Sequence, residues 1–175
     1  SRRQRQMCIR DSHHFDHTGG VSALKKATGC RVIGPDNPKI ADIDETMTEG
    51  ARVTVLGYGF EIMEVPGHTL DHIAYYNAED GTLFCGDTLF VGGCGRVFEG
   101  TFPMMQQSLA KLSHLPIETK VYCTHEYTMA NLSFARKVEP TNADLSAHID
   151  SCQKQRDNDL PTVPSTIGPE LLITP

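Results

Sequence analysis

The chain has 175 residues, a net charge of −6 and 39% hydrophobic residues, enough for one sizeable core with a small appendage. The acidic balance argues against nucleic-acid binding, which needs clustered Lys and Arg, and no apolar run reaches the roughly 18 residues of a membrane span. The six cysteines form no Cys-x-x-Cys pair, which is typical of reduced thiols. We therefore expect a cytoplasmic protein without a membrane or nucleic-acid partner.

Residues 1–12 do not resemble a strand that leads into the histidine-rich segment after them. Codons for Gln6 to Ser12 can be written that spell a transposon end used in sequencing libraries. We expect residues 1–12 to be a non-native artefact and leave them out of the fold. An ordinary basic N-terminal tail is the alternative, and resequencing the locus would decide between the two.

Residues 12–17 read Ser-His-His-Phe-Asp-His, and Gly19-Gly20 follow shortly after. Imidazole and carboxylate groups at alternate positions of an extended loop can point the same way, as a divalent metal requires. A helix after the glycines would direct its positive N-terminal end at the site, which suits a bound anion. A tag or a solvated turn can also be rich in histidine, but Asp-His before Gly-Gly is unlike a tag.

Apolar periodicity and turn residues predict the elements that follow. Helices are expected at Val21–Thr28, Phe102–His114, Met129–Val138 and Asn142–Gln155. Strands are expected at Arg31–Gly34, Arg52–Leu56, Phe60–Val65, His72–Asn77, Thr82–Gly86 and Lys120–Cys123, the second and third as a hairpin. An acidic helical turn within Ala41–Met47, a flexible loop at Gly92–Gly95 and a proline-rich tail from Pro161 complete the prediction.

Three further polar residues, His68, Asp87 and His125, each follow a short apolar strand. Loops at one edge of a sheet can converge, so these side chains can meet the histidine-rich loop. The full set of candidate ligands is then His14, Asp16, His17, His68, Asp87 and His125. It is too large for one tetrahedral zinc ion and fits two divalent ions that share a carboxylate.

Four histidines are left out of this set. His13 should lie on the opposite side of the loop from His14, and His72 should support the His68 loop or its strand. His114 and His148 fall on expected helices and should be surface residues.

These residues resemble the metallo-β-lactamase superfamily, whose motif His-x-His-x-Asp-His fits residues 12–17 except at Ser12. Later blocks resemble one family within it, glyoxalase II or hydroxyacylglutathione hydrolase. They are Gly86–Phe90, Gly93–Gly100, Tyr122–Thr128, Asn131-Leu132, Phe134-Ala135 and Pro161–Thr166. The metal motif is specific only to the superfamily, whereas the later blocks are specific to the family.

The resemblance implies an α/β protein with a metallo-β-lactamase-like αββα sandwich over residues 13–126. Residues 127–175 would form a C-terminal helical segment that binds substrate. The strands before the metal loop would be missing. The family also continues past the position of Thr174-Pro175, into a basic segment that helps hold glutathione. We therefore expect a partial sandwich domain, a truncated helical domain and impaired activity.

The resemblance also assigns two divalent metal ions bridged by Asp87. The other ligands would be the Ser12 position, His14 and His68 for the first ion, and Asp16, His17 and His125 for the second. Zinc is the expected metal, although iron and manganese accept the same ligands. A serine hydroxyl is too short and too weak a donor to replace imidazole, so Ser12 should weaken the first site.

The implied reaction is hydrolysis of an S-2-hydroxyacylglutathione, S-lactoylglutathione, to glutathione and lactate in methylglyoxal detoxification. Asp16 and Asp87 would be the catalytic carboxylates, and a hydroxide shared by the ions would attack the thioester. Arg96, Phe98 and Tyr127 match positions that contact the glutathione moiety. Phe98 stands where some members have tyrosine. The departing thiol has a pKa of roughly 8.5, so no strong general acid is needed.

The resemblance thus predicts a monomeric thioesterase whose partner is a small-molecule glutathione thioester. Two other functions stay open. One is another enzyme of the superfamily, such as a mononuclear iron persulfide dioxygenase or a lactonase, although the blocks around Arg96 and Tyr127 favour the thioesterase. The other is an inactive metal-binding fragment.

Overall fold

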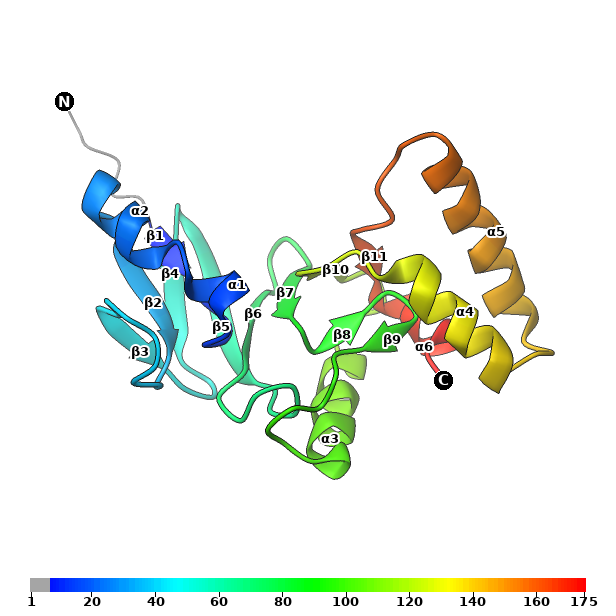
Figure 1. The fold of residues 1–175 in the computed structure, drawn as a ribbon, viewed down its shortest axis with the longest axis horizontal. Coiled ribbons are helices and arrows are strands. Elements are labelled where there is room, and N and C mark those ends of the chain that lie inside the picture. The colour runs from blue at the N-terminus through cyan, green and yellow to red at the C-terminus, as the bar shows by residue number, and fades with distance from the viewer. Residues whose placement is uncertain (1–6) are drawn as a thin grey trace.

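A computed structural model describes residues 7–175 (Figure 1). The strands are β1 Met7–Ile9, β2 Arg31–Pro35, β3 Glu45–Met47, β4 Arg52–Val55, β5 Tyr58–Glu64, β6 Ile73–Asn77, β7 Thr82–Gly86, β8 Leu89–Phe90, β9 Gly93–Cys94, β10 Lys120–Cys123 and β11 Ser165–Thr166. The helices are α1 Phe15–Thr18, α2 Val21–Thr28, α3 Phe102–Ser113, α4 Thr128–Val138, α5 Ala143–Asp157 and α6 Ile167–Ile173.

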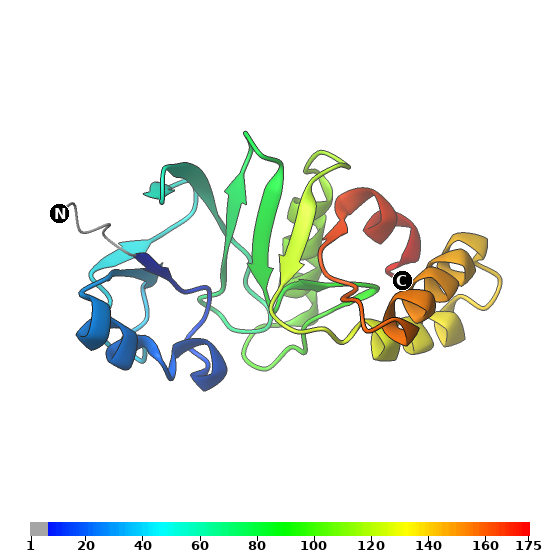
Figure 2. The same ribbon diagram turned by 90° about the horizontal axis from the view of Figure 1, so that it is seen from above.

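Two sheets form the centre of the described chain. The smaller has the strand order β1-β2-β3, with parallel neighbours, and the larger is mixed, with the order β11-β10-β7-β6-β5-β4. Figure 2 shows the smaller sheet at one end of the molecule, the larger sheet in the middle and the C-terminal helices at the opposite end. Strands β7 and β10 are parallel neighbours in the larger sheet, so their C-terminal ends lie side by side in the middle of this arrangement.

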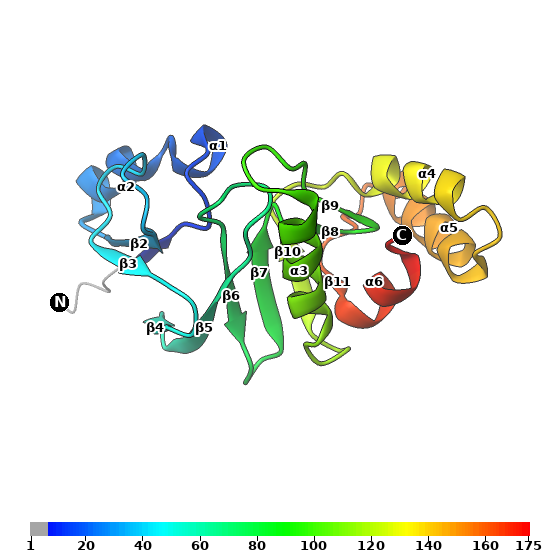
Figure 3. The same cartoon turned by 90° about the horizontal axis from the view of Figure 1, so that it is seen from below.

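Alternation of side chains along β2 explains the layers. Ile33 belongs to the core cluster between the two sheets, whereas its neighbour Val32 packs with Val21 of α2 on the outer side. On the far face of the larger sheet, Leu83 of β7 packs with Leu112 of α3, and Figure 3 shows α3 lying over these strands. The layer order is α2, smaller sheet, larger sheet, α3. The predicted αββα sandwich is therefore confirmed.

The C-terminal helices have a core of their own. Leu132 and Ala135 of α4 share a cluster with Leu145 and Cys152 of α5, and the Asn142 side chain accepts the Leu145 N–H to cap α5. The two helices predicted here from apolar spacing are confirmed to within two residues at each end. Among residues 7–175, no helix combines the length and the apolar character that crossing a membrane requires.

Two segments of the smaller sheet differ from the prediction. The acidic helical turn expected within Ala41–Met47 is wrong, because residues 45–47 form β3 and pair in parallel with β2. Burial of Met47 in the core between the sheets outweighs the local preference. Residues 7–9, within the segment expected to lie outside the fold, form β1 beside β2. Residues 1–6 of that segment lie outside the described residues.

Two later segments are also more regular than predicted. The expected flexible loop at Gly92–Gly95 contains β9, which pairs with β8 as a short hairpin. The proline-rich tail contains β11 and α6, because Ile167 and Ile173 are almost completely buried. Glu170 of α6 is buried too, and it accepts the Gly92 N–H at 2.8 Å. The tail is thus joined to the hairpin.

Replacing Glu170 tests this junction. Its carboxylate also accepts hydrogen bonds from Ser165 and Thr174, and burial raises its pKa above the ordinary 4.5. Glu170→Gln can keep all three contacts and cannot ionise. Because the pKa of Glu170 is raised in the folded state, the unchanged chain should lose stability relative to this variant as pH rises through the raised pKa. Glu170→Leu leaves the buried N–H of Gly92 without an acceptor and should cost about 1–3 kcal/mol. Urea unfolding of both variants across pH measures this, and equal stabilities would contradict the role of Glu170.

Candidate metal centre

The histidine-rich segment bends into a helical turn after its second histidine. His14 is extended and precedes α1, and its carbonyl oxygen accepts the backbone N–H groups of both His17 and Thr18. Asp16 and His17 therefore lie on one helical turn. The extended loop that the sequence predicted for these ligands is wrong, although the same side chains still come together.

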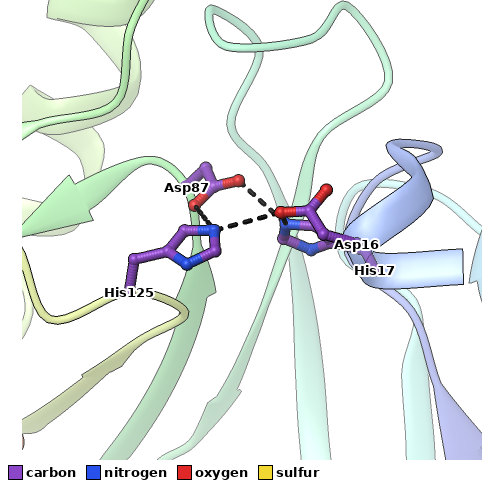
Figure 4. A group of neighbouring side chains, drawn as sticks. All are labelled: Asp16, His17, Asp87 and His125. Carbon is purple, nitrogen blue, oxygen red and sulfur yellow. Dashed lines mark hydrogen bonds and ion pairs between the residues drawn. The ribbon is translucent and has the colours of Figure 1, made fainter.

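Four side chains from three separate segments meet in a first group, the four-ligand group: Asp16, His17, Asp87 and His125 (Figure 4). One ligand atom of each lies within 4.8 Å of all the others. Asp87 follows β7 and His125 follows β10, and these strands are parallel neighbours that end at the same sheet edge. Asp16 and His17 approach from α1 on the opposite side.

The spacing of the four-ligand group suits a metal ion. Ligand atoms that hold a tetrahedral ion at about 2.0–2.2 Å lie about 3.3–3.6 Å apart. His17 Nε2 lies 2.8 and 3.6 Å from Asp87 Oδ2 and Asp16 Oδ2, and His125 Nε2 lies 3.1 and 3.5 Å from Asp16 Oδ2 and Asp87 Oδ1. His17 Nε2 and Asp87 Oδ1 are buried and make no hydrogen bond. Buried polar atoms rarely lack a partner, so a cation between them fits this group.

A second group, the three-ligand group, consists of His14, His68 and Asp87. His14 Nδ1 lies 3.0 Å from His68 Nε2, which lies 3.3 Å from Asp87 Oδ2. Asp87 therefore belongs to both groups. Ser12, at the first position of the motif, is fully buried, and its hydroxyl has no hydrogen-bond partner. The three-ligand group thus has one imidazole fewer than the motif provides.

Hydrogen bonds behind the ligands orient two of the rings. His68 Nδ1 lies 2.7 Å from the carbonyl oxygen of Arg96 and must donate to it, which leaves Nε2 of the neutral ring with its lone pair toward the group. His17 Nδ1 lies 2.7 Å from Asp11 Oδ1 and donates to this carboxylate, so its Nε2 also faces the ligand group. Such partners fix the tautomer of a metal-binding histidine. Asp11 lies within residues 1–12, which were expected to be non-native, and its contact with His17 was not predicted.

The electrostatics of the groups follow from these contacts. Burial opposes a charge on His17, but the nearby carboxylates of Asp11 and Asp87, 2.7 and 2.8 Å from its ring nitrogens, raise its pKa to about 10. Burial would raise the pKa of Asp87, yet His17 and His68 hold it below its usual range. Burial and the nearby His68 lower the pKa of His14. The raised pKa leaves His17 protonated beside Asp87 at neutral pH, and a divalent ion bound to His17 Nε2 would displace that proton.

A cavity of about 400 Å³ opens over both groups. Its lining residues are His14, Asp16, His68, Asp87, Phe90, Arg96, Phe98, His125 and Tyr127. The three residues that were predicted to contact a substrate therefore line one cavity together with five of the six predicted ligands, all except His17. Phe90, at the end of β8, lines the same wall and was not singled out from the sequence.

Two aromatic rings of the cavity pack directly on candidate ligands. The Phe98 ring lies edge-on to the rings of His14 and His68, with centroids 5.7 and 5.2 Å away. The Tyr127 ring stacks on His125 at 5.1 Å. These contacts limit the space open to water beside the imidazoles.

Comparison with known proteins agrees with this geometry. A family model described as the metallo-beta-lactamase superfamily matches residues 13–125, which is more than half of the chain. The chain belongs to the metallo-β-lactamase superfamily. A second model, described as the hydroxyacylglutathione hydrolase C-terminus, matches residues 126–175.

Relatives within the superfamily confirm the predicted family resemblance. The hydroxyacylglutathione hydrolases of Ectopseudomonas mendocina (strain ymp) and Pseudomonas aeruginosa (strain LESB58) are 56% and 57% identical over 93% of this chain. The chain spans 63% and 64% of their lengths, which is less than two thirds. The crystal structure of TTHA1623 in a di-iron-bound form has the same fold, with a TM-score of 0.67 and 23% identity, over 95% of this chain and 75% of that one.

His13, His114 and His148 belong to neither of the two ligand groups. His13 lies between two carboxylates, with Nδ1 3.0 Å from Asp71 and Nε2 3.1 Å from Glu99. Its ring therefore joins the metal loop to the segments after His68 and Arg96. His114 is exposed as predicted, whereas His148 is half-buried rather than a surface residue.

A substitution at Gly95 tests how tightly the candidate metal centre is packed. A Cβ at Gly95 would lie 1.8 Å from the carbonyl oxygen of Asp87 and 3.5 Å from His68 Nδ1. Gly95→Ala should displace the shared carboxylate and lower metal affinity by about 10-fold or more, as elemental analysis after dialysis would show. Gly59→Ala is the matched control, because nothing lies within 4 Å of its Cβ. Equal metal contents would contradict the packing argument.

Proposed function

We propose that the protein is a metal-dependent thioesterase that hydrolyses S-2-hydroxyacylglutathione, with S-lactoylglutathione as substrate, in methylglyoxal detoxification. The observation that carries this proposal is that Asp87 belongs to two ligand groups beneath one cavity, which Arg96 and Tyr127 also line. Relatives named hydroxyacylglutathione hydrolase, at 56% and 57% identity, support the choice of substrate.

We propose two divalent ions, most simply zinc, with iron and manganese as alternatives. The four-ligand group would hold one ion, and His14, His68 and Asp87 would hold the other more weakly, because Ser12 adds no imidazole to them. When bound, such ions polarise a carbonyl oxygen and lower the pKa of water toward neutrality. Asp87 is suited to the shared position because Oδ2 faces His17 and His68 while Oδ1 faces His125.

The remaining cavity residues would bind and orient the thioester. The Arg96 guanidinium lies 5.1 Å from the centre of the Phe98 ring, so a positive charge at the cavity wall can pair with a carboxylate of the glutathione moiety. Tyr127 would complete the wall beside His125. The departing thiolate is stable near neutral pH, since a free thiol has a pKa of roughly 8.5, and no general acid has to be supplied.

We also propose that residues 13–126 form the catalytic domain and residues 127–175 the substrate-binding one. The two family-model matches, at 13–125 and 126–175, support this division. The five cysteines whose side chains are described are free thiols, which supports a cytoplasmic location. We also propose that the enzyme is a monomer.

Elemental analysis together with an assay of thiol release from S-lactoylglutathione tests the proposal. We expect thiol release that a chelator abolishes and that added zinc restores. A single iron per chain with oxygen consumption on a persulfide substrate would contradict it. So would thiol release that is unaffected by removal of the metal.

A second candidate is a metal-binding protein without thioesterase activity. Ser12 favours it, because the three-ligand group lacks the imidazole that the superfamily motif places there. Bound metal in the four-ligand group without thiol release would support this reading over the first.

A further inference from the structure

His72 lies directly behind the shared carboxylate. Its side chain is fully buried, and it immediately precedes β6, the antiparallel neighbour of β7. The backbone N–H of Asp87 donates to His72 Nε2 at 3.0 Å. The sequence-based expectation, in which His72 supports the His68 loop or its strand, did not include this contact with Asp87.

This hydrogen bond determines which nitrogen of the ring carries the proton. A backbone N–H can only donate, so Nε2 must present its lone pair. The proton of the neutral ring then sits on Nδ1, which lies 3.2 Å from the carbonyl oxygen of Ile73. One nitrogen of His72 therefore faces Asp87, and the other faces the start of β6.

The turn that carries Asp87 packs against the same ring. Gly86 has a φ of 51°, a left-handed conformation that redirects the chain between β7 and Asp87. A Cβ at Gly86 would lie 2.5 Å from His72 Cε1 and 2.5 Å from Asp11 Oδ2. The turn thus has a tightly packed side, and its one hydrogen bond to the ring fixes how the peptide before Asp87 is oriented.

The orientation of that peptide bears on both ligand groups. Asp87 Oδ2 lies 2.8 Å from His17 Nε2 and 3.3 Å from His68 Nε2, and Oδ1 lies 3.5 Å from His125 Nε2. A rotation of the backbone at Asp87 would move both oxygens away from these partners together. No other single residue of the described chain belongs to both groups.

We propose that His72 is a positioning residue for the metal centre. By accepting the Asp87 N–H, it holds one carboxylate where it reaches both ligand groups. The inference rests on the proposed function and goes beyond it, because His72 belongs to neither ligand group and does not line the cavity.

Two substitutions separate the two ends of the ring. In His72→Gln, the side-chain oxygen can reach the Nε2 position and accept the Asp87 N–H, but the donor to Ile73 is lost. In His72→Asn, the amide can still donate to Ile73 but is too short to reach Asp87. We expect His72→Gln to keep the cobalt(II) affinity and absorption spectrum of the unchanged chain. His72→Asn should lower the affinity by about 10–100-fold, as loss of a partner behind a ligand does.

The opposite order, or equal behaviour of the two variants, would overturn the proposal, because the ring would then matter only for β6 or for packing. Nitrogen-15 NMR of the unchanged, metal-free protein tests the same point without a substitution. We expect an unprotonated Nε2, and a proton on Nε2 would also overturn it. A chain that binds no cobalt overturns the proposed metal centre itself. One that binds cobalt but fails the variant test overturns only the role of His72.

Discussion

Replacing Ser12 with histidine should raise the metal content from about one to about two ions per chain. We also expect it to accelerate hydrolysis of S-lactoylglutathione by about 100-fold or more. The four-ligand group is complete as it stands, whereas His14 and His68 have only Asp87 as a further ligand. Ser12 is fully buried, and its hydroxyl has no hydrogen-bond partner. An imidazole at this position of the motif would add the nitrogen donor that the three-ligand group lacks.

Ser12→Ala is the matched control, since it removes the hydroxyl without adding a ligand. It should leave both metal content and hydrolysis unchanged. Elemental analysis gives the stoichiometry, and release of thiol gives the rate. Thermal unfolding of each metal-free variant shows whether the larger side chain is accommodated. A folded Ser12→His variant that still binds one ion and hydrolyses no faster would show that the hydroxyl is not the weak point of the centre.

Most of the ligands could be predicted because each has a local signature. Asp87 and His125 are polar residues placed directly after short apolar strands, and the ends of parallel neighbouring strands meet at one sheet edge. That prediction required only the positions of the strands in the sequence and the identity of the residues that follow them. Arg96 and Tyr127 were assigned differently, by resemblance to the family blocks that contain them, and the structure brings both to the cavity wall.

Residues that act through a ligand left no such signature. Asp11 reaches His17 across a turn, and His72 reaches the Asp87 backbone from a neighbouring strand. Both contacts depend on tertiary packing rather than on spacing in the sequence. The missed strand β3 has the same cause, because residues 45–47 are polar except for Met47 and become a strand only by pairing with β2. Local patterns thus located the chemistry but not the residues that hold it in place.

In the Ser12→His chain, where both groups are expected to hold an ion, Asp87→Asn should remove both metal ions. We expect the affinity to fall by about 100-fold or more and hydrolysis of S-lactoylglutathione to fall to background. A carboxylate offers two anionic oxygens, and here one faces His17 and His68 while the other faces His125. An amide has only one oxygen, without a net charge, and its nitrogen is not a metal ligand. With the amide nitrogen at the Oδ2 position, both groups face an atom that cannot bind. With the nitrogen at the Oδ1 position, the four-ligand group loses its oxygen beside His125, and the uncharged oxygen at Oδ2 is a weaker donor for both groups.

Asp16→Asn is the comparison that gives this prediction its force. Asp16 belongs only to the four-ligand group, where His17, His125 and Asp87 remain. In the same Ser12→His background, its substitution should therefore weaken one ion and leave the other as in the Ser12→His chain. Titration of each metal-free variant with cobalt(II) would show this difference. If Asp87→Asn and Asp16→Asn lost the same amount of metal, Asp87 would not be a shared ligand, and the two groups would have to be treated as separate sites.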